Sequence, residues 1–288
     1  MKEGTIPVPG GRVWYGIHGD GGTPLLCLHG GPGFPHDYLE PLRDLVGDRA
    51  VVFYDQLGCG RSERPDDRSL WSLERSLEEV DAVRSELGLS RFHLLGSSWG
   101  GLLAIEYAFG RPEGLQSLVL ASPLVSVPRW VEDAGRLKAA LPGEVEEAID
   151  RHEESGFLDC PEYIAATLVF WKRHVCRVDP WPDELERAFA GFGVEPYRTM
   201  WGPSEFTQTG NLRGRDASRG LGALGAPVLW TCGRHDEATP ESTEHFHSLT
   251  PRSTFVVFEK SSHTPHLEER EPYIETVRSF LRAVDGPT

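Results

Sequence analysis

Residues 93–101 read HLLGSSWGG and place two serines between glycines. An apolar, strand-like run ends at Gly96, and an apolar, helix-like segment, LLAIEYAF, follows the glycine pair at 100 and 101. A nucleophile on such a tight strand-to-helix turn needs small neighbours two positions before and after it, and Gly96 and Gly100 supply them for Ser98. Large side chains hold the same positions around Ser97. The spacing therefore predicts Ser98, not Ser97, as a nucleophile.

On both sides of this turn, short apolar runs recur between helix-like segments. They occupy residues 24–30, 50–55, 91–96, 117–122, 227–233 and 254–259. Runs of this length suit strands that are buried on both faces of a parallel sheet. The helix-like segment 69–89 has apolar residues at helical spacing and charges on its other face. The alternation predicts an α/β protein with a mostly parallel, doubly wound sheet. Residues 5–17 predict an antiparallel hairpin at its edge.

One stretch interrupts this alternation. Residues 126–214 contain no strand-like run, and four of the eight tryptophans lie there: Trp130, Trp171, Trp181 and Trp201. We expect a helical cap over 126–214, inserted into an α/β core formed by 1–125 and 215–288. The insertion follows a strand, at the sheet edge where open α/β sheets bind ligands, so its underside is expected to line a pocket. A helical subdomain with its own small core is the alternative.

A serine nucleophile needs a base, and the base needs an orienting carboxylate. In the doubly wound hydrolase order, both follow later strands. Asp236 comes directly after the run at 227–233, and His263 comes after the run at 254–259. His266 is the competing histidine, but it lies further from the strand end and at the expected start of a helix. The sequence therefore predicts Ser98, Asp236 and His263 as the catalytic set.

When a serine attacks a carbonyl carbon in acyl transfer, negative charge develops on the carbonyl oxygen. The reaction therefore also needs N–H groups that face this oxyanion. The loop HGGPG, residues 29–33, follows the first buried strand and leaves its N–H groups unobstructed. We assign Gly31 and Trp99 as the oxyanion donors, and His29 as a residue that braces the loop. A plain turn or a phosphate-binding loop is the alternative, although neither GxxxxGK nor GxGxxG is present.

Acidic residues outnumber basic ones by 44 to 29, which gives a formal net charge of −15. Such a field repels phosphate backbones and anionic headgroups, so neither nucleic acid nor a membrane is expected as a partner. The first residues lack a signal-peptide core and no run reaches about 20 apolar residues, so we expect a cytoplasmic protein. Five scattered cysteines without a CxxC pair indicate buried thiols rather than disulfides or a zinc site.

Together, the motifs HGGPGFPHDYL, FYDQLGCGRSERPDD, LLGSSWGG, PSEFTQTGNL, GRHDEATP and SSHTPHLEE resemble the proline iminopeptidase family of α/β-hydrolases, which includes tricorn-interacting aminopeptidases and amino acid amidases. The resemblance implies an α/β-hydrolase fold with a helical cap, no cofactor and no metal. It also implies that Glu205 and Glu237 bind the free α-amino group of the substrate, while Ser98, Asp236, His263, Gly31 and Trp99 carry the chemistry.

The expected function is therefore a serine hydrolase that releases an N-terminal residue, proline or another small apolar one, from short peptides, amides or arylamides. One alternative is an esterase or amidase that acts on a specialised biosynthetic substrate. Another is a ligand-binding homologue without turnover. Glu205 and Glu237 distinguish the aminopeptidase from the esterase, because an esterase has no need to bind an ammonium group. The oligomeric state is not predicted.

Overall fold

The computed structural model describes residues 1–286. Its strands are β1 (Lys2–Val8), β2 (Gly11–His18), β3 (Leu25–Leu28), β4 (Val51–Tyr54), β5 (Phe92–Ser97), β6 (Leu115–Ala121), β7 (Val228–Gly233) and β8 (Ser253–Phe258). Its α-helices are α1 (Leu73–Glu86), α2 (Trp99–Phe109), α3 (Val127–Ala139), α4 (Gly143–Ser155), α5 (Pro161–His174), α6 (Asp183–Ala190), α7 (Val194–Met200), α8 (Pro240–Ser248), α9 (Pro265–Glu268) and α10 (Arg270–Asp285). Short 3-10 helices are η1 (His36–Leu45), η2 (Arg68–Leu70) and η3 (Ser218–Ala223).

Within residues 1–286, all eight strands join one sheet in the order β1-β2-β4-β3-β5-β6-β7-β8. The first two strands form an antiparallel hairpin, and β2 also runs antiparallel to β4. Every pair from β4 to β8 is parallel. The predicted fold class, the edge hairpin and the six predicted strands are confirmed, with boundaries that shift by one to three residues.

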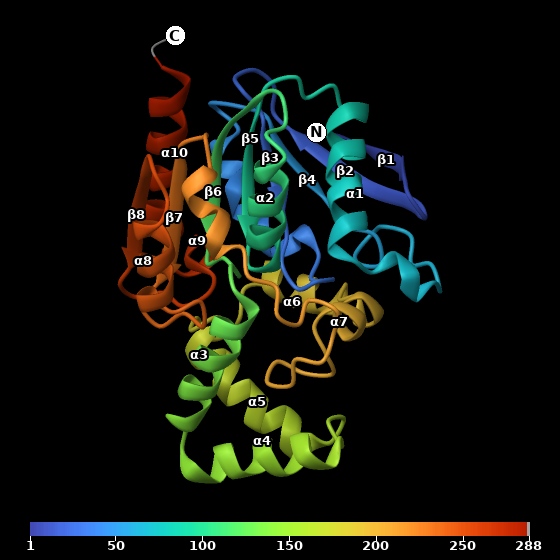
Figure 1. Ribbon diagram of the computed structural model, residues 1–288, viewed down its shortest axis with the longest axis vertical. Coiled ribbons are helices and arrows are strands. Elements are labelled where there is room, and N and C mark those ends of the chain that lie inside the picture. The colour runs from blue at the N-terminus through green and yellow to red at the C-terminus, as the bar shows by residue number, and fades with distance from the viewer. Residues whose placement is uncertain (287–288) are drawn as a thin grey trace.

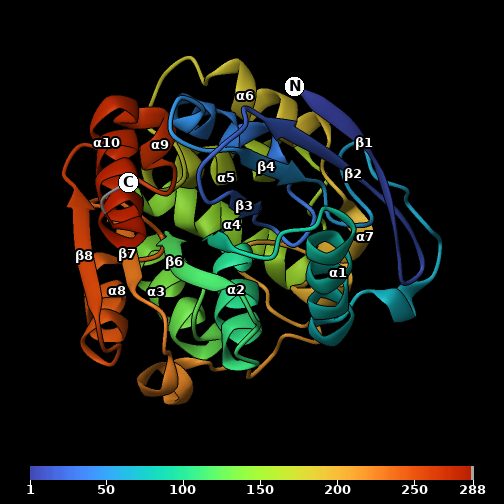
Figure 2. The same cartoon turned by 90° about the horizontal axis from the view of Figure 1, so that it is seen from above.

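Helices cover both faces of the sheet (Figure 2). Alternate side chains of β3 point to opposite faces, as a strand requires. Leu26 and Leu28 belong to the core that includes α1, α2 and α8, whereas Leu25 and Cys27 belong to the core beneath η1 and α10. This two-sided burial explains why the central strands are continuous apolar runs in the sequence.

Helices α3–α7 lie between β6 and β7 in the chain, and α3–α5 form a lobe beyond the ends of the strands (Figure 1). The lobe has a small core of its own, in which Ile149 of α4 packs near Tyr163 and Phe170 of α5. A single bridge between Ser126 and Asp216 joins the start and end of the insertion. The segment therefore combines the features of a cap and of a helical subdomain, because it faces the sheet ends and also has a small core of its own.

Among residues 1–286, no helix combines the length and the apolar character needed to cross a lipid bilayer.

Candidate active site

Ser98 lies on the turn between β5 and α2, with φ of 56° and ψ of −122°. A positive φ at a non-glycine residue is strained, and strain of this kind persists where the surrounding structure enforces it. The two glycines allow the tight turn: a Cβ at Gly96 would lie 2.1 Å from the carbonyl oxygen of Gly100, and one at Gly100 would lie 2.3 Å from the carbonyl oxygen of Leu28. Ser97, by contrast, is fully buried.

Ser98 opens onto a cavity of about 390 Å³ that lies between the carboxyl ends of the strands and the helices that follow β6. Its walls are mostly apolar and come largely from the insertion, and they include Leu158, Tyr163, Ile164, Trp171, Phe189 and Phe192. Ser98, His263, Glu205 and Glu237 line the same cavity, and Glu237 Oε1 lies 3.7 Å from His263 Nε2. The insertion therefore builds the walls of a pocket whose floor is the strand-to-helix turn.

Asp236 follows β7, and His263 follows β8. The Oδ1 atom of Asp236 lies 2.7 Å from the Nδ1 atom of His263. The carboxylate also accepts hydrogen bonds from Ser122 Oγ at 2.6 Å and from the N–H groups of Gly233 at 3.1 Å and Ala238 at 2.8 Å. Asp236 is thus held from several directions, and it fixes the orientation of the His263 ring.

The histidine that faces the cavity is His263. Its Nε2 atom lies 3.7 Å from Glu237 Oε1. Within residues 1–286, Ser98 Oγ and His263 share the cavity without a hydrogen bond that meets normal geometry. Such bonds are often long before substrate binds and tighten in the complex. The competitor His266 is buried in α9, where burial lowers the pKa of its ring to about 3.

Of the two assigned oxyanion donors, Trp99 follows Ser98 directly, and Gly31 follows Gly30, where an added Cβ would lie 2.9 Å from Ser98 Cβ. Trp99 is the first residue of α2, a position whose N–H group has no acceptor inside its own helix. Gly31 lines the cavity beside Gly30. The N–H group of Gly30 donates to the Tyr38 hydroxyl at 2.8 Å, and the carbonyl of Gly30 accepts from Phe34 at 3.2 Å. The Gly30 peptide is therefore held in place next to the Gly31 N–H group.

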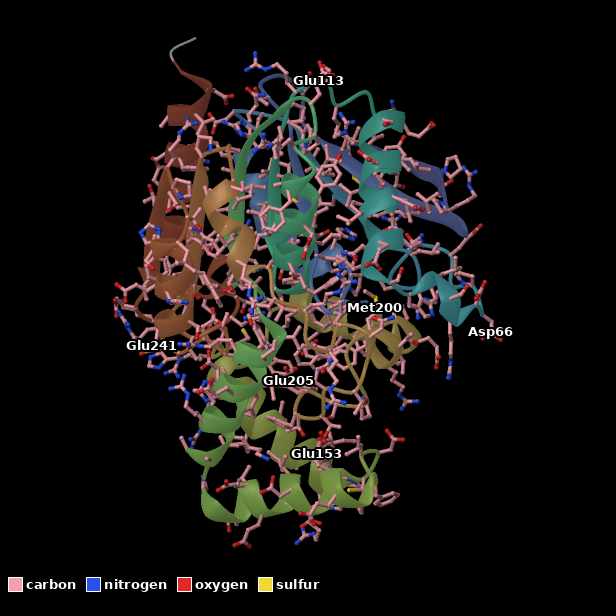
Figure 3. All side chains as sticks on the ribbon, in the orientation of Figure 1. Asp66, Glu113, Glu153, Met200, Glu205 and Glu241 are labelled. Atoms are coloured by element: carbon pink, nitrogen blue, oxygen red, sulfur yellow. The ribbon has the colours of Figure 1, made fainter. Side chains whose placement is uncertain are left out.

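Glu205 and Glu237 reach the cavity from different elements. Glu205 lies in the loop after α7, and Glu237 follows Asp236 (Figure 3 labels Glu205). Burial, followed by the charges of Glu205 and Asp236, holds the pKa of Glu237 well above its usual range. Burial also raises the pKa of Glu205, against the field of His263. The cavity therefore disfavours two negative charges and would gain from a cation.

Several residues that hold the site carry no mark in the sequence. Ser122 supports Asp236, and Tyr38 supports the glycine loop. Glu153 of α4 accepts hydrogen bonds from Ser204 Oγ at 2.8 Å and from the hydroxyls of Thr207 and Tyr163. Its side chain thus ties the loop that carries Glu205 to the lobe (Figure 3). No local signal marks Ser122 or Glu153, because their partners Asp236 and Ser204 lie 114 and 51 positions away, and the contact of Tyr38 with Gly30, eight positions away, depends on how the loop folds back.

Among the described residues 1–286, no group of three or more His, Cys, Asp and Glu side chains is placed to hold a metal ion. All five cysteines are free and buried, as predicted.

The fold and the constellation at its sheet ends define an α/β-hydrolase, and residues 23–270 match the family model described as alpha/beta hydrolase fold. A proline iminopeptidase of Heyndrickxia coagulans is 46% identical over 285 residues, which cover 98% of this chain and 99% of the relative. The chain belongs to the proline iminopeptidase family of α/β-hydrolases, and it is an enzyme of that family.

Two solved structures agree with this assignment. The crystal structure of a proline iminopeptidase from Mycobacterium smegmatis superposes with a TM-score of 0.91 at 37% identity and covers 99% of both chains. The crystal structure of VinJ superposes with a TM-score of 0.95 at 38% identity and covers 98% of this chain and 99% of that one. The similarity spans the insertion as well as the sheet.

Proposed function

We propose that this enzyme is a serine aminopeptidase that releases an N-terminal residue, proline or another small apolar one, from short peptides, amides or arylamides. The observation that carries the proposal is the pair of carboxylates, half-buried Glu205 and buried Glu237, in the same cavity as Ser98 and His263. The names of the relatives support it, since they are proline iminopeptidases.

The acid pair explains how the enzyme would recognise the amino end of a peptide chain. A substrate ammonium placed between Glu205 and Glu237 would relieve the repulsion that raises the pKa of Glu237. Charge-assisted hydrogen bonds in a water-poor cavity are stronger than those in bulk solvent. A blocked or absent amino group would leave both carboxylates without a partner, so the site discriminates against it.

The reaction proceeds in two acyl-transfer steps. With the ammonium held, the first carbonyl carbon lies over Ser98, and His263 takes the serine proton as Ser98 Oγ attacks. The N–H groups of Gly31 and Trp99 hold the oxyanion, and the leaving amine receives the proton from His263. Water then attacks the acyl-enzyme with His263 again as the base. Asp236 keeps the proton on Nδ1 and stabilises the imidazolium.

The apolar wall of the cavity would take the first side chain and the leaving group. Trp130 stands edge-on to His263 with ring centroids 5.8 Å apart, and it lines the same cavity as Leu124 and Trp201. Such surroundings favour a compact apolar ring or side chain and disfavour a charged one. This contact set supports proline or a residue of similar size at the first position.

The decisive comparison uses the p-nitroanilides of L-proline and of cyclopentanecarboxylic acid, which differ only in the ring nitrogen. We expect the wild type to prefer the prolyl substrate by about 100-fold or more in kcat/KM, because two charge-assisted contacts contribute about 1.5–3 kcal/mol each. Glu205→Gln should lower kcat/KM for the prolyl substrate by about 10- to 100-fold and change the carbocyclic one by less than about threefold.

Glu113→Gln is the matched control, because Glu113 is exposed at the far end of the molecule from Glu205 (Figure 3). It should leave both substrates unchanged. Equal losses on both substrates in Glu205→Gln would remove the anchoring role. A wild type that prefers the carbocyclic substrate, or simple acyl esters, would instead favour an esterase acting on a specialised substrate. No turnover of any of them would favour a ligand-binding homologue.

A further inference from the structure

Three neighbouring strands, β4, β3 and β5, end beside the nucleophile, and each carries a buried polar side chain just beyond its end. Gln56 follows β4, His29 follows β3, and Trp99 follows β5. His29 and Trp99 are fully buried, and Gln56 is 6% exposed. Buried polar groups at this depth need partners, so their hydrogen bonds are informative.

The side-chain amide of Gln56 bridges the other two residues. Its Nε2 group donates to the carbonyl oxygen of His29 at 3.0 Å. Its Oε1 atom accepts from the indole Nε1 of Trp99 at 2.9 Å. One amide therefore connects the loop that leads to Gly31 with the residue that begins α2, and these are the two segments assigned to the oxyanion hole.

The backbone of Gln56 fixes His29 as well. Its N–H group donates to His29 Nε2 at 2.8 Å, so that nitrogen carries no proton. Burial lowers the pKa of the ring to about 4, which keeps it neutral at pH 7 with its proton on Nδ1. Nδ1 lies 3.1 Å from the carbonyl oxygen of Gly30, to which it donates, and 3.2 Å from Gln56 Nε2, whose own hydrogen bond goes to the His29 carbonyl oxygen. The His29 ring thus holds the peptide that precedes Gly31.

We propose that Gln56 is a positioning residue for the oxyanion hole, because its amide sets the separation between the Gly31 and Trp99 N–H groups. The inference rests on the proposed function, which assigns those two groups to the oxyanion. An oxyanion hole works by preorganisation, and a misplacement on the order of 0.5 Å weakens it. An amide suits this bridge because it donates at one end and accepts at the other.

The first test is the variant Gln56→Glu, which keeps the acceptor for Trp99 and removes the donor to His29. We expect kcat for prolyl p-nitroanilide to fall by about 10- to 100-fold, with KM within about twofold, because only transition-state stabilisation is lost. Gln116→Glu is the matched control. The amide of Gln116 also accepts at one end, from Arg91, and donates at the other, to the carbonyl oxygen of Gly114, but it lies at the other end of β6 from the cavity. It should leave kcat unchanged.

The second test uses pyrrolidine-2-boronic acid, in which Ser98 Oγ adds to boron while its proton passes to His263. The resulting tetrahedral boronate carries an oxygen that occupies the hole. Affinity for this adduct should fall in Gln56→Glu by the same factor as kcat, while affinity for prolinol, which lacks the tetrahedral centre, should stay unchanged. Trp99→Phe removes the other hydrogen bond of the bridge, from Trp99 to Gln56, so affinity for the boronate should fall while affinity for prolinol stays unchanged. This variant also provides the test if Gln56→Glu fails to fold.

Two results would overturn the inference. In the first, kcat and boronate affinity stay at the wild-type level while the melting temperature falls, which would mean that Gln56 only satisfies a buried indole. In the second, prolinol and boronate affinities fall together, which would mean a general collapse of the site. Failure of the proposed function looks different, because the wild type itself would then fail to form the boronate adduct at Ser98.

Discussion

At the residue scale, the backbone beneath Ser98 leaves no room for a side chain at Gly100. A Cβ at Gly100 would lie 2.3 Å from the Leu28 carbonyl oxygen, whereas one at Gly135 in α3 would meet nothing within 4 Å. Gly100→Ala should therefore destabilise the fold by about 3 kcal/mol and lower activity. Gly135→Ala, the control in an exposed helix, should stabilise it by about 0.5–1 kcal/mol.

Thermal unfolding of both variants checks this prediction. A Gly100→Ala protein with the melting temperature and turnover of the wild type would show that the turn tolerates a side chain, and the strained geometry at Ser98 would then lose its explanation.

The choice between Ser97 and Ser98 shows what residue-level reasoning can reach. The steric requirement of the turn acts within a few residues, so spacing alone selected the serine with φ of 56°. The role of Ser122, which donates to Asp236 from 114 positions away, has no such local signature. Contacts of this kind exist only once the strands are in register, and composition or periodicity cannot show them.

At the element scale, the loop that bears Glu205 depends on α4. Glu153 accepts hydrogen bonds from Ser204 and Thr207 of that loop and from Tyr163 of α5. Glu153→Gln weakens this clamp, so we expect KM for prolyl p-nitroanilide to rise by about tenfold with a smaller change in kcat, because the clamp supports binding of the ammonium.

The exposed neighbour Glu154 provides the control for this prediction. Steady-state kinetics of Glu154→Gln should match those of the wild type. If Glu153→Gln did the same, the clamp would have no part in placing Glu205.

The elements themselves differed in how far the sequence predicted them. Strands such as β3, β5 and β7 were found because burial on both faces leaves a continuous apolar run. The insertion was predicted only because it interrupts the alternation of strand-like and helix-like segments. Its helices pack partly on one another, around Phe170, and partly over the cavity, so their arrangement depends on long-range contacts. The division at residues 126 and 214 stays a proposal.

At the scale of the whole molecule, the acid pair links function to stability. The pKa of Glu237 in the fold lies well above its usual value, which is about 4.3 in an unfolded chain. Between those two values the folded state binds more protons than the unfolded state, so this group lowers stability as pH rises through the window. Glu237→Gln removes this effect. The melting temperature of the variant, relative to that of the wild type, should therefore rise between about pH 4.5, which is near the unfolded pKa, and about pH 8, which is about 4 units above it.

The same scan of melting temperature against pH with Glu113→Gln should run parallel to the wild type, because that side chain is exposed. A constant difference in melting temperature between Glu237→Gln and wild type across the window would show that Glu237 ionises in the cavity without penalty.

We propose that Ser98 is the nucleophile of a site that recognises a free amine. The most direct test of this proposal is mass spectrometry of the enzyme after reaction with a fluorophosphonate, with and without prolinol. We predict one adduct, located on Ser98, that prolinol suppresses and N-acetylprolinol does not. An adduct on another residue, or equal protection by both ligands, would contradict the account.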